Sequence, residues 1–337
     1  MGAQLKRVQD QVIVITGASS GIGLMTAKTA ASRGARVVLA ARNESDLRRA
    51  VDGIRSAGGR ATYAVADVAV PEDVERIAET AIQEFGRIDT WVNNAAVAVY
   101  GRLTAVPIAD LRRQFEVNYW GQVYGARAAL PHLRRQGGAL INVASALADR
   151  AIPLQGNYSA AKHALKAFTD SLRMELEEEG APVSVTLLKP GSIDTPLFDK
   201  ARTLLGVEPQ PVPPVYAPEL VARAILECAE RPVRDLVVSG MGKVLSLAGM
   251  VAPRLTDRYM ERSTFDAQKT RLVVSPDRPD NLYDPVAHDG GERGRNWNGR
   301  VHGTSLYTAL ALRPRLAAGV TAALVATLAV AAMRNRP

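Results

Sequence analysis

Between Gln11 and Gly240 the chain alternates between short apolar runs and amphipathic stretches with helical periodicity. No other feature of the sequence limits the choice of folds as strongly. The runs are VIVIT from Val12, RVVLA from Arg36, TYAVA from Thr62, IDTWV from Ile88, ALINVA from Ala139, VSVTLL from Val183 and DLVVS from Asp235. Most are apolar throughout, which is typical of parallel strands covered on both faces. Seven such strands predict an α/β fold with a doubly wound parallel sheet and a ligand crevice at the carboxyl ends of its strands.

The regular alternation stops near Gly240. Residues 241–262 have the pattern of one more helical stretch, and residues 275–305 are rich in Gly, Asp, Arg, Asn and Pro, which is typical of a linker. Residues 316–333, LAAGVTAALVATLAVAAM, carry no charge. We therefore expect a Rossmann-type domain over residues 1–240, an extension with a polar linker over residues 241–310, and an apolar C-terminal helix over residues 311–337.

The formal net charge of +8 is concentrated in the C-terminal part of the chain. Residues 1–240 contain 28 Lys and Arg against 26 Asp and Glu, which leaves 14 (42 − 28) against 8 (34 − 26) for residues 241–337. A basic tail of this kind can bind anionic lipid or nucleic acid, or it can be solvated without any partner. The chain has no zinc-ligand spacing, RNA-binding signature or basic helical stripe with interleaved aromatic residues, so we expect no nucleic-acid partner. The four histidines have no metal-ligand spacing, and we expect no metal.

Residues 316–333 leave two interpretations open. As a helix they would measure about 27 Å, just short of the ~30 Å hydrocarbon core of a bilayer. A membrane anchor is favoured, because a linker-like segment precedes the run and the tail carries the positive surplus. Since eight of these residues are alanine, a helix that packs on the body or on a second subunit also fits. The N-terminus lacks the apolar region of a signal peptide, so we expect the folded body to stay in the cytoplasm.

A glycine-rich segment, TGASSGIG at residues 16–23, follows the first predicted strand and begins the first helix. Gly17 permits the tight turn, Gly21 lets the backbone approach a pyrophosphate, and Gly23 allows close packing of helix on sheet. Backbone amides at the start of the helix then face the phosphates. The segment therefore predicts a nucleotide site, with contacts expected from Thr16, Gly17, Ser19, Ser20, Gly21, Ile22 and Gly23.

The end of the second predicted strand indicates which nucleotide binds. An acidic residue normally holds the free ribose hydroxyls of NAD(H) at this point, but the chain has Ala41 followed by Arg42. A guanidinium group suits a 2′-phosphate, so we expect NADP(H) in preference to NAD(H). After the third strand, Asp67 can accept a hydrogen bond from the adenine amine, and Val68 can pack on the ring.

The segment YSAAK places Tyr158 and Lys162 four residues apart, on one face of a predicted helix. This spacing is common by chance, and two solvated polar side chains would also explain it. A free tyrosine has a pKa near ~10, so only about one in a thousand is ionised at pH 7. A nearby ammonium group favours the phenolate, and lowering the pKa by ~3 units corresponds to ~4 kcal/mol. The pair can therefore make a phenolic proton mobile.

Residues 10–240 resemble the short-chain dehydrogenase/reductase superfamily, in its subgroup with TGxxxGxG and Tyr-x-x-x-Lys motifs. The motifs occur in the family's order: TGASSGIG, Asp67, NNAA from Asn93, Asn118 in EVNYWG, Ser145, YSAAK, and KPGSIDTP from Lys189. Ala96 stands where the family usually has glycine. The roughly 95 residues after Gly240 lie outside the resemblance.

The resemblance implies a catalytic set of Asn118, Ser145, Tyr158 and Lys162. Tyr158 would exchange a proton with the substrate oxygen while a hydride moves to or from the nicotinamide, and Ser145 would hold that oxygen. Lys162 would also touch the nicotinamide ribose, and Asn118 would anchor a water that links Lys162 to solvent. Further cofactor contacts are implied for Asn94, Ala95, Tyr158, Lys162, Pro190, Gly191, Ile193 and Thr195. The resemblance also implies a homodimer or homotetramer, through helices at residues 107–136 and 156–180.

The segment between Ser145 and Tyr158 supplies Leu147, Ile152 and Leu154 as expected substrate contacts, and Ser192–Pro218 has the composition of a lid. These apolar walls favour a bulky apolar alcohol or ketone. Two other functions are alternatives to an NADP(H)-dependent oxidoreductase. Epimerases and dehydratases of the same superfamily usually carry a TGxxGxxG spacing, which this chain does not match. A membrane-tethered NADP(H)-binding scaffold or sensor without turnover has no need of all four catalytic residues.

Overall fold

The computed structural model describes residues 3–275 and 277–313. The apolar run at residues 316–333 lies outside these residues, so the predicted C-terminal helix is not described. Across the described part of the chain, no helix combines the length and the hydropathy that a membrane span requires.

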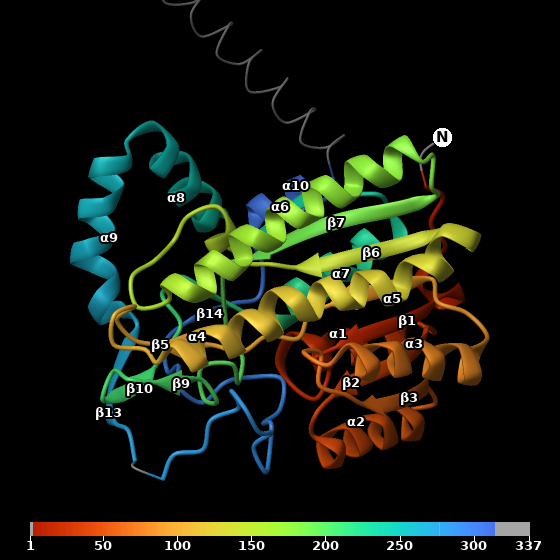
Figure 1. Ribbon diagram of the computed structural model, residues 1–337, viewed down its shortest axis with the longest axis horizontal. Coiled ribbons are helices and arrows are strands. Elements are labelled where there is room, and N and C mark those ends of the chain that lie inside the picture. The colour runs from red at the N-terminus through yellow and green to blue at the C-terminus, as the bar shows by residue number, and fades with distance from the viewer. Residues whose placement is uncertain (1–2, 276, 314–337) are drawn as a thin grey trace, which may run out of the picture.

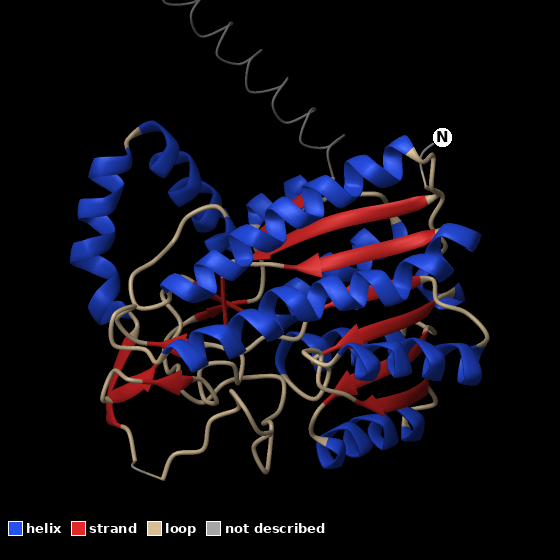
Figure 2. Ribbon diagram, viewed as in Figure 1, coloured by secondary structure: helices blue, strands red, loops and turns tan. Residues whose placement is uncertain are grey.

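All seven predicted strands lie in one parallel sheet, in the order β12-β7-β6-β4-β1-β2-β3 (Figures 1 and 2). They are β1 Val12–Thr16, β2 Arg36–Ala41, β3 Arg60–Val65, β4 Thr90–Asn93, β6 Gly138–Val143, β7 Val183–Pro190 and β12 Asp235–Val238. The order reverses between β1 and β4, where a doubly wound sheet opens its crevice. The carboxyl ends of the strands point to the left in Figure 2, toward the small strands. The predicted doubly wound α/β fold is confirmed.

Helices cover both faces of the sheet. One layer contains α1 Gly21–Ser32, α2 Glu44–Ser56 and α7 Pro218–Glu230, and the other contains α3 Pro71–Phe85, α5 Gly121–Gln136 and α6 Gly156–Glu178. Successive strand residues point to opposite faces. Ile13 and Ile15 therefore pack in the first layer, whereas Val14 packs in the second. All three are fully buried, as the continuous apolar runs require.

The helix expected over residues 107–136 is interrupted. Helix α4 covers Ile108–Phe115, a π-helical turn (η2) covers Glu116–Trp120, and α5 follows. Such turns occur frequently at functional sites. Asn118 lies within this turn and is fully buried.

The expected helical stretch over residues 241–262 is two helices, α8 Gly240–Val251 and α9 Pro253–Ala267, which form an arm at the upper left of Figure 1. Pro253 begins the second helix, since proline fits the first helical turn and breaks a helix interior. Small strands gather at the carboxyl side of the large sheet: β5 Val99–Tyr100, β8 Ser192–Ile193, β9 Arg202–Thr203, β10 Val207–Pro209, β11 Val215–Tyr216, β13 Lys269–Val273 and β14 Val301–His302. Helix α10, Leu306–Ala311, follows.

The segment with linker composition packs on the folded body along much of its length. Arg278 donates hydrogen bonds to the carbonyl of Asp199 (2.6 Å) and to Glu208 (2.7 Å), and Leu282 is fully buried in the core. β14 pairs with β11. The polar residues of this segment form hydrogen bonds with backbone and charged groups of the body. Its composition alone does not reveal these contacts. The division of the chain into three parts stays a prediction.

Candidate functional site

A cavity of about 310 Å³ opens beside the point where the strand order reverses, within the size range of small-molecule sites. It runs from the glycine-rich loop to the start of α6. Of the predicted residues, these line it: Gly17, Ser19, Ser20, Gly21, Ile22, Arg42, Asp67, Val68, Asn94, Ala95, Ser145, Leu147, Ile152, Tyr158, Lys162, Pro190, Gly191, Ile193 and Thr195. Thr16, Gly23, Asn118 and Leu154 are not among the lining residues. The fold thus brings most of the predicted site together.

The glycine-rich loop has the shape that a dinucleotide phosphate requires. Gly17 has φ +65°, and a Cβ there would lie 2.7 Å from the Cα of Ala95. A Cβ on Gly23 would lie 2.2 Å from the carbonyl oxygen of Gly17. Side chains at these positions would push the loop apart, so the loop is a cradle that only glycine permits. Its place at the N-terminus of α1 fits the phosphates of NAD or NADP.

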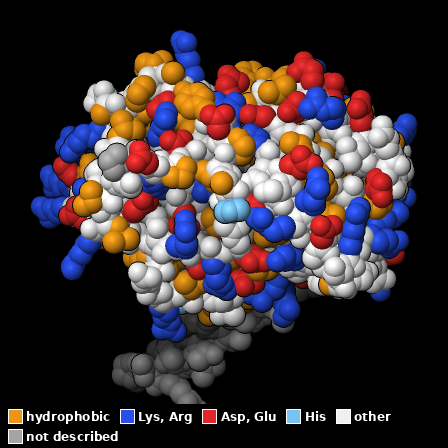
Figure 3. Space-filling model, turned by 90° about the horizontal axis from the view of Figure 1, so that it is seen from below, with side chains coloured by type: hydrophobic (Ala, Val, Ile, Leu, Met, Phe, Trp, Pro, Cys, Tyr) orange, Lys and Arg blue, Asp and Glu red, His pale blue; other side chains and the backbone are white. Residues whose placement is uncertain are grey.

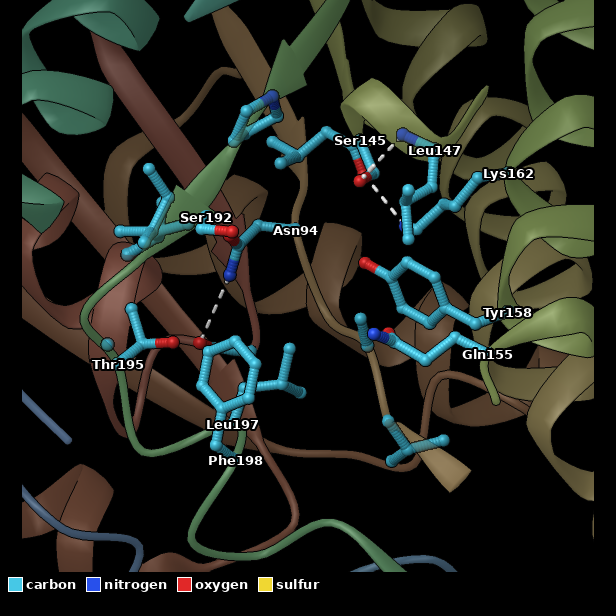
Figure 4. Close-up of a pocket in the computed structure, with 18 of the residues that line it drawn as sticks. Asn94, Ser145, Leu147, Gln155, Tyr158, Lys162, Ser192, Thr195, Leu197 and Phe198 are labelled. Atoms are coloured by element: carbon cyan, nitrogen blue, oxygen red, sulfur yellow. Dashed lines mark hydrogen bonds between the residues drawn. The ribbon is translucent and has the colours of Figure 1, made fainter. Parts of the chain in front are cut away.

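Asn94 and Thr16 hold this loop against the end of β4. The Asn94 side chain donates to the carbonyl of Thr16 (2.9 Å) and of Gly17 (3.2 Å), as Figure 4 shows for Gly17. The Thr16 hydroxyl accepts from the backbone amides of Asn94 (3.0 Å) and Ala95 (3.1 Å). Thr16 therefore acts on the site through the shape of the loop.

Tyr158 and Lys162 project into the cavity from the first turns of α6, on one face as the spacing predicts (Figure 4). The Tyr158 hydroxyl points toward Ser145, whose oxygen accepts from the Leu147 amide at 3.1 Å (Figure 4). The Lys162 ammonium nitrogen lies 5.6 Å from the centre of the Tyr158 ring and donates to the carbonyl of Val143 at 3.0 Å.

Burial controls the ionisation of both groups. It raises the pKa of Tyr158 to about 12, although the neighbouring Ser145 hydroxyl acts in the opposite direction. Burial also lowers the pKa of Lys162 to about 7. The sequence predicted a lowered tyrosine pKa, but here the cost of burying a phenolate is larger than any stabilisation by the lysine. At neutral pH the phenol is protonated and the lysine is divided between its charged and neutral forms.

Asn118 braces the loop after β4. Its side chain donates to the carbonyl of Val97 (2.9 Å) and accepts from the amide of Val97 (2.9 Å). Val97 lines the cavity, so Asn118 sets the position of a wall residue. The water-anchoring role implied by the resemblance stays a prediction.

Charged groups gather at the ends of β2 and β3. Arg42 donates to the carbonyl of Tyr283 at 2.6 Å and to the carbonyl of Asn281, and it lies 3.9 Å from the Asp67 carboxylate. Asp67 also pairs with Arg113 of α4 and accepts from the amide of Ala69. The sequence analysis missed Arg113 and the 281–283 segment. They lie far from Arg42 along the chain, and no local motif marks them.

The end of the cavity where the substrate is expected is lined mainly by apolar side chains, together with Arg150 and Gln155. Leu147 and Ile152 line it as expected, but Leu154 does not. Leu154 has φ +67°, and its carbonyl accepts from the Gly101 amide at 3.0 Å, so it shapes the loop beneath the wall. The sequence analysis missed several wall residues: Tyr100, Leu197, Phe198, Met241, Leu245 and Met260. The only signal for the last three is the apolar composition of α8 and the pattern of α9.

Metal chemistry has no candidate ligands in the described ranges, where no group of three or more His, Cys, Asp or Glu side chains is placed to hold an ion.

Known proteins resemble this chain over most of its length. The sequence profile described as short chain dehydrogenase matches residues 11–205. The uncharacterized oxidoreductase YxnA of Bacillus subtilis is 48% identical over 328 residues, which covers 96% of this chain and 91% of that protein. An 11-beta-hydroxysteroid dehydrogenase A of Arachis hypogaea is 34% identical over 265 residues, 75% of each chain.

Solved structures share the fold and bind dinucleotides. A short-chain dehydrogenase/reductase of Burkholderia phymatum in complex with NAD has a TM-score of 0.66 and 28% identity, over 73% of this chain and 94% of that chain. An alcohol dehydrogenase of Thermococcus sibiricus complexed with 5-hydroxy-NADP has a TM-score of 0.60 and 27% identity, over 67% and 95%. The neighbours thus bind either NAD or NADP. This chain belongs to the short-chain dehydrogenase/reductase family of oxidoreductases.

Proposed function

We propose that the protein is an NADP(H)-dependent oxidoreductase that interconverts a carbonyl and a secondary alcohol on a bulky apolar molecule, with Tyr158 as the acid and base. The observation that carries this proposal is the position of the Tyr158 hydroxyl. It points toward Ser145 in the same cavity that the glycine-rich loop lines. A proton donor and a nucleotide cradle thus share one site.

When bound, the cofactor supplies or takes up a hydride at its nicotinamide ring. In reduction, the protonated phenol of Tyr158 donates a hydrogen bond to the carbonyl oxygen, and Ser145 donates a second. As the oxygen gains negative charge, the O–H bond of Tyr158 breaks and its proton passes to that oxygen. The phenolate that remains is stabilised by the charged form of Lys162. With a pKa of about 12, Tyr158 is protonated at neutral pH, which is the form that donates a proton in reduction.

Two observations support NADP(H). Arg42 lines the cavity at the end of β2, where Ala41 replaces the acidic residue that suits a free ribose. A planar, permanently charged guanidinium matches a phosphate group. NAD(H) is the less favoured cofactor.

The apolar wall supports a bulky substrate. Tyr100, Phe198 and Leu245 line the cavity together with Leu147 and Ile152. The relatives from Arachis hypogaea and Sesamum indicum are named 11-beta-hydroxysteroid dehydrogenases, so bulky polycyclic ketones belong in the first substrate panel.

Partners and placement stay predictions. We expect a homodimer or homotetramer through α4, α5 and α6, and a cytoplasmic body with residues 316–333 as a membrane anchor. On the face seen in Figure 3, basic and acidic side chains are interspersed, and this face carries no continuous basic patch for nucleic acid. Fractionation of the full chain tests the anchor: recovery of all protein in the soluble fraction would rule it out.

The test of the function is NADPH oxidation by the full chain. The panel contains steroid and aryl ketones, small aldehydes and sugar-derived polar ketones, with NADH as the cofactor comparison. We expect turnover with the apolar ketones, and a higher kcat/KM with NADPH than with NADH. Faster turnover of the polar compounds would contradict the apolar site, and binding of NADPH without turnover of any carbonyl would favour the scaffold.

A further inference from the structure

Residues 281–291, which we call the rim segment, lie along the part of the cavity between the glycine-rich loop and the end of β2. At its start, the carbonyls of Asn281 and Tyr283 accept hydrogen bonds from Arg42. At its end, the carbonyl of Gly291 accepts from the amide of Gly21 at 3.0 Å. The C-terminal extension therefore borders both the expected phosphate-binding arginine and the N-terminus of α1.

The middle of the rim segment is fixed to the β2–α2 connection. The side chain of Asn43 donates to the carbonyl of Val286 at 2.8 Å, and the carboxylate of Asp46 accepts from the amide of Asp289 at 2.5 Å. Asn43 and Asp46 are both buried. The rim segment therefore forms one wall of the cavity, which Asn281, Pro285 and Asp289 line.

A buried lysine, Lys200, lies against this wall. The ammonium nitrogen of Lys200 donates to the hydroxyl of Ser20 at 2.9 Å and to the carboxylate of Asp289 at 2.9 Å. The side chains of Lys200 and Asp289 are only 11% and 9% exposed, and both residues line the same cavity as Arg42. Ser20 belongs to the glycine-rich loop, so Lys200 stands at the nucleotide cradle itself.

A buried ion pair of this kind needs an explanation, because desolvation of two charges often outweighs their attraction. Burial lowers the pKa of Lys200, and the Asp289 carboxylate acts in the opposite direction. Asp289 thus favours the ammonium form of Lys200 beside the loop that faces the cofactor phosphates. Lysine binds phosphate well as a point charge.

We propose that Lys200, presented by Asp289 of the rim segment, is a second cation that recognises the 2′-phosphate of the cofactor beside Arg42. This proposal rests on the proposed function. Arg42 and Lys200 together supply two positive charges for a dianionic phosphate, and the Asp289 carboxylate competes with that phosphate for Lys200. The C-terminal extension therefore takes part in the choice between NADP(H) and NAD(H).

The test measures binding and does not need turnover. Calorimetry on the full chain gives the Kd of 2′,5′-ADP, 5′-AMP, NADP⁺ and NAD⁺ for the wild type and for Lys200→Gln. We expect Lys200→Gln to weaken the two ligands with a 2′-phosphate by about tenfold, and the other two by less than about twofold. Asp289→Asn should tighten the 2′-phosphate ligands by roughly threefold, because it removes the competing charge.

Lys6→Gln is the matched control. Lys6 also pairs with a buried aspartate, Asp89 (2.9 Å), but it is not among the residues that line the cavity. This variant should leave all four Kd values unchanged. Lys200→Gln leaves Asp289 buried without its partner and can fail to fold. The double variant Lys200→Gln/Asp289→Asn removes both charges, and it should show the same selective loss.

Three results would overturn the proposal. The first is that Lys200→Gln weakens the binding of all four ligands equally, which would assign Lys200 to the pyrophosphate or to the wall alone. The second is that Lys200→Gln changes no Kd. The third is that Asp289→Asn weakens the binding of the ligands with a 2′-phosphate. Failure of the proposed function is read separately, in the wild type. If the wild-type chain binds no dinucleotide, the proposed oxidoreductase activity is wrong. If it prefers NAD⁺, the proposed preference for NADP(H) is wrong before any variant is made.

Discussion

The hydroxyl of Tyr158 points toward the hydroxyl of Ser145, although the two residues come from different elements (Figure 4). Ser145 follows β6, and Tyr158 lies in the first turn of α6. The Leu147 amide fixes the Ser145 oxygen at 3.1 Å. A substrate oxygen that takes a hydrogen bond from each hydroxyl is therefore held at one point, next to the proton it receives.

Replacement of Tyr158 by Phe should abolish this proton transfer while the apolar packing of the ring is kept. General acid catalysis contributes about 10²- to 10⁴-fold, so we expect kcat for ketone reduction to fall by that order. The Kd of NADPH, measured by fluorescence, should change little. Tyr63→Phe is the matched control, since the Tyr63 hydroxyl contacts Glu44 at 3.2 Å on the surface. A Tyr158→Phe enzyme with wild-type kcat would remove Tyr158 from the mechanism.

The parallel sheet and the nucleotide cradle could be predicted from the sequence because local signals specify them. A buried parallel strand such as β1 needs a continuous apolar run, and the turn at Gly17 needs a residue that tolerates φ +65°. The predicted run VIVIT coincides with β1, Val12–Thr16. Tyr158 and Lys162 share a face because helix geometry puts i and i+4 together.

The remaining parts of the site depend on contacts between segments far apart in the chain. Arg113 of α4 pairs with Asp67, which follows β3, and the rim segment reaches Arg42 across 239 residues. The composition of residues 275–305 resembles that of a linker, although Leu282 is buried in the core. The pKa of Tyr158 also depends on burial, which a four-residue spacing does not reveal.

Lys162 should make the fold more stable at alkaline pH. Burial lowers its pKa from 10.5 to about 7, so between these values the unfolded chain binds more protons than the folded chain. Stability then rises with pH from about 7 to 10.5, and the contribution is lost as the pH falls toward 7. Between pH 7 and 9, Lys162 alone should add up to roughly 2–3 kcal/mol to the free energy of unfolding.

Urea denaturation at pH 7 and pH 9 measures this contribution. Lys162→Met removes the titrating group, so the increase in unfolding free energy between the two pH values should be smaller in this variant than in the wild type. Lys166→Met is the control on the same helix, since Lys166 is 39% exposed and pairs with Asp149. The assignment is wrong if wild type and Lys162→Met gain equal stability.

Asn118→Ala should show whether Asn118 stabilises the fold through Val97 or takes part in turnover. The change leaves the amide of Val97 without its buried partner and its carbonyl with only Gln114, at 3.4 Å, so the free energy of unfolding should fall by roughly 1–3 kcal/mol. Urea denaturation measures the loss of stability, and NADPH oxidation measures the rate. A variant that keeps its stability but loses turnover would contradict the bracing role and favour the water-anchoring role implied by the family resemblance.

The arm formed by α8 and α9 should determine which substrates fit, because Leu245 and Met260 line the cavity. Leu245→Trp adds an indole ring to this wall, so kcat/KM should fall by about tenfold or more for steroid-sized ketones, while small aldehydes keep their rates. Leu247→Trp is the matched control: Leu247 belongs to the same helix, is 48% exposed and does not line the cavity. It should leave both substrate classes unaffected. If Leu245→Trp slows small and large substrates equally, the arm does not select by size, and the bulky-substrate proposal would have to rest on Tyr100 and Phe198 instead.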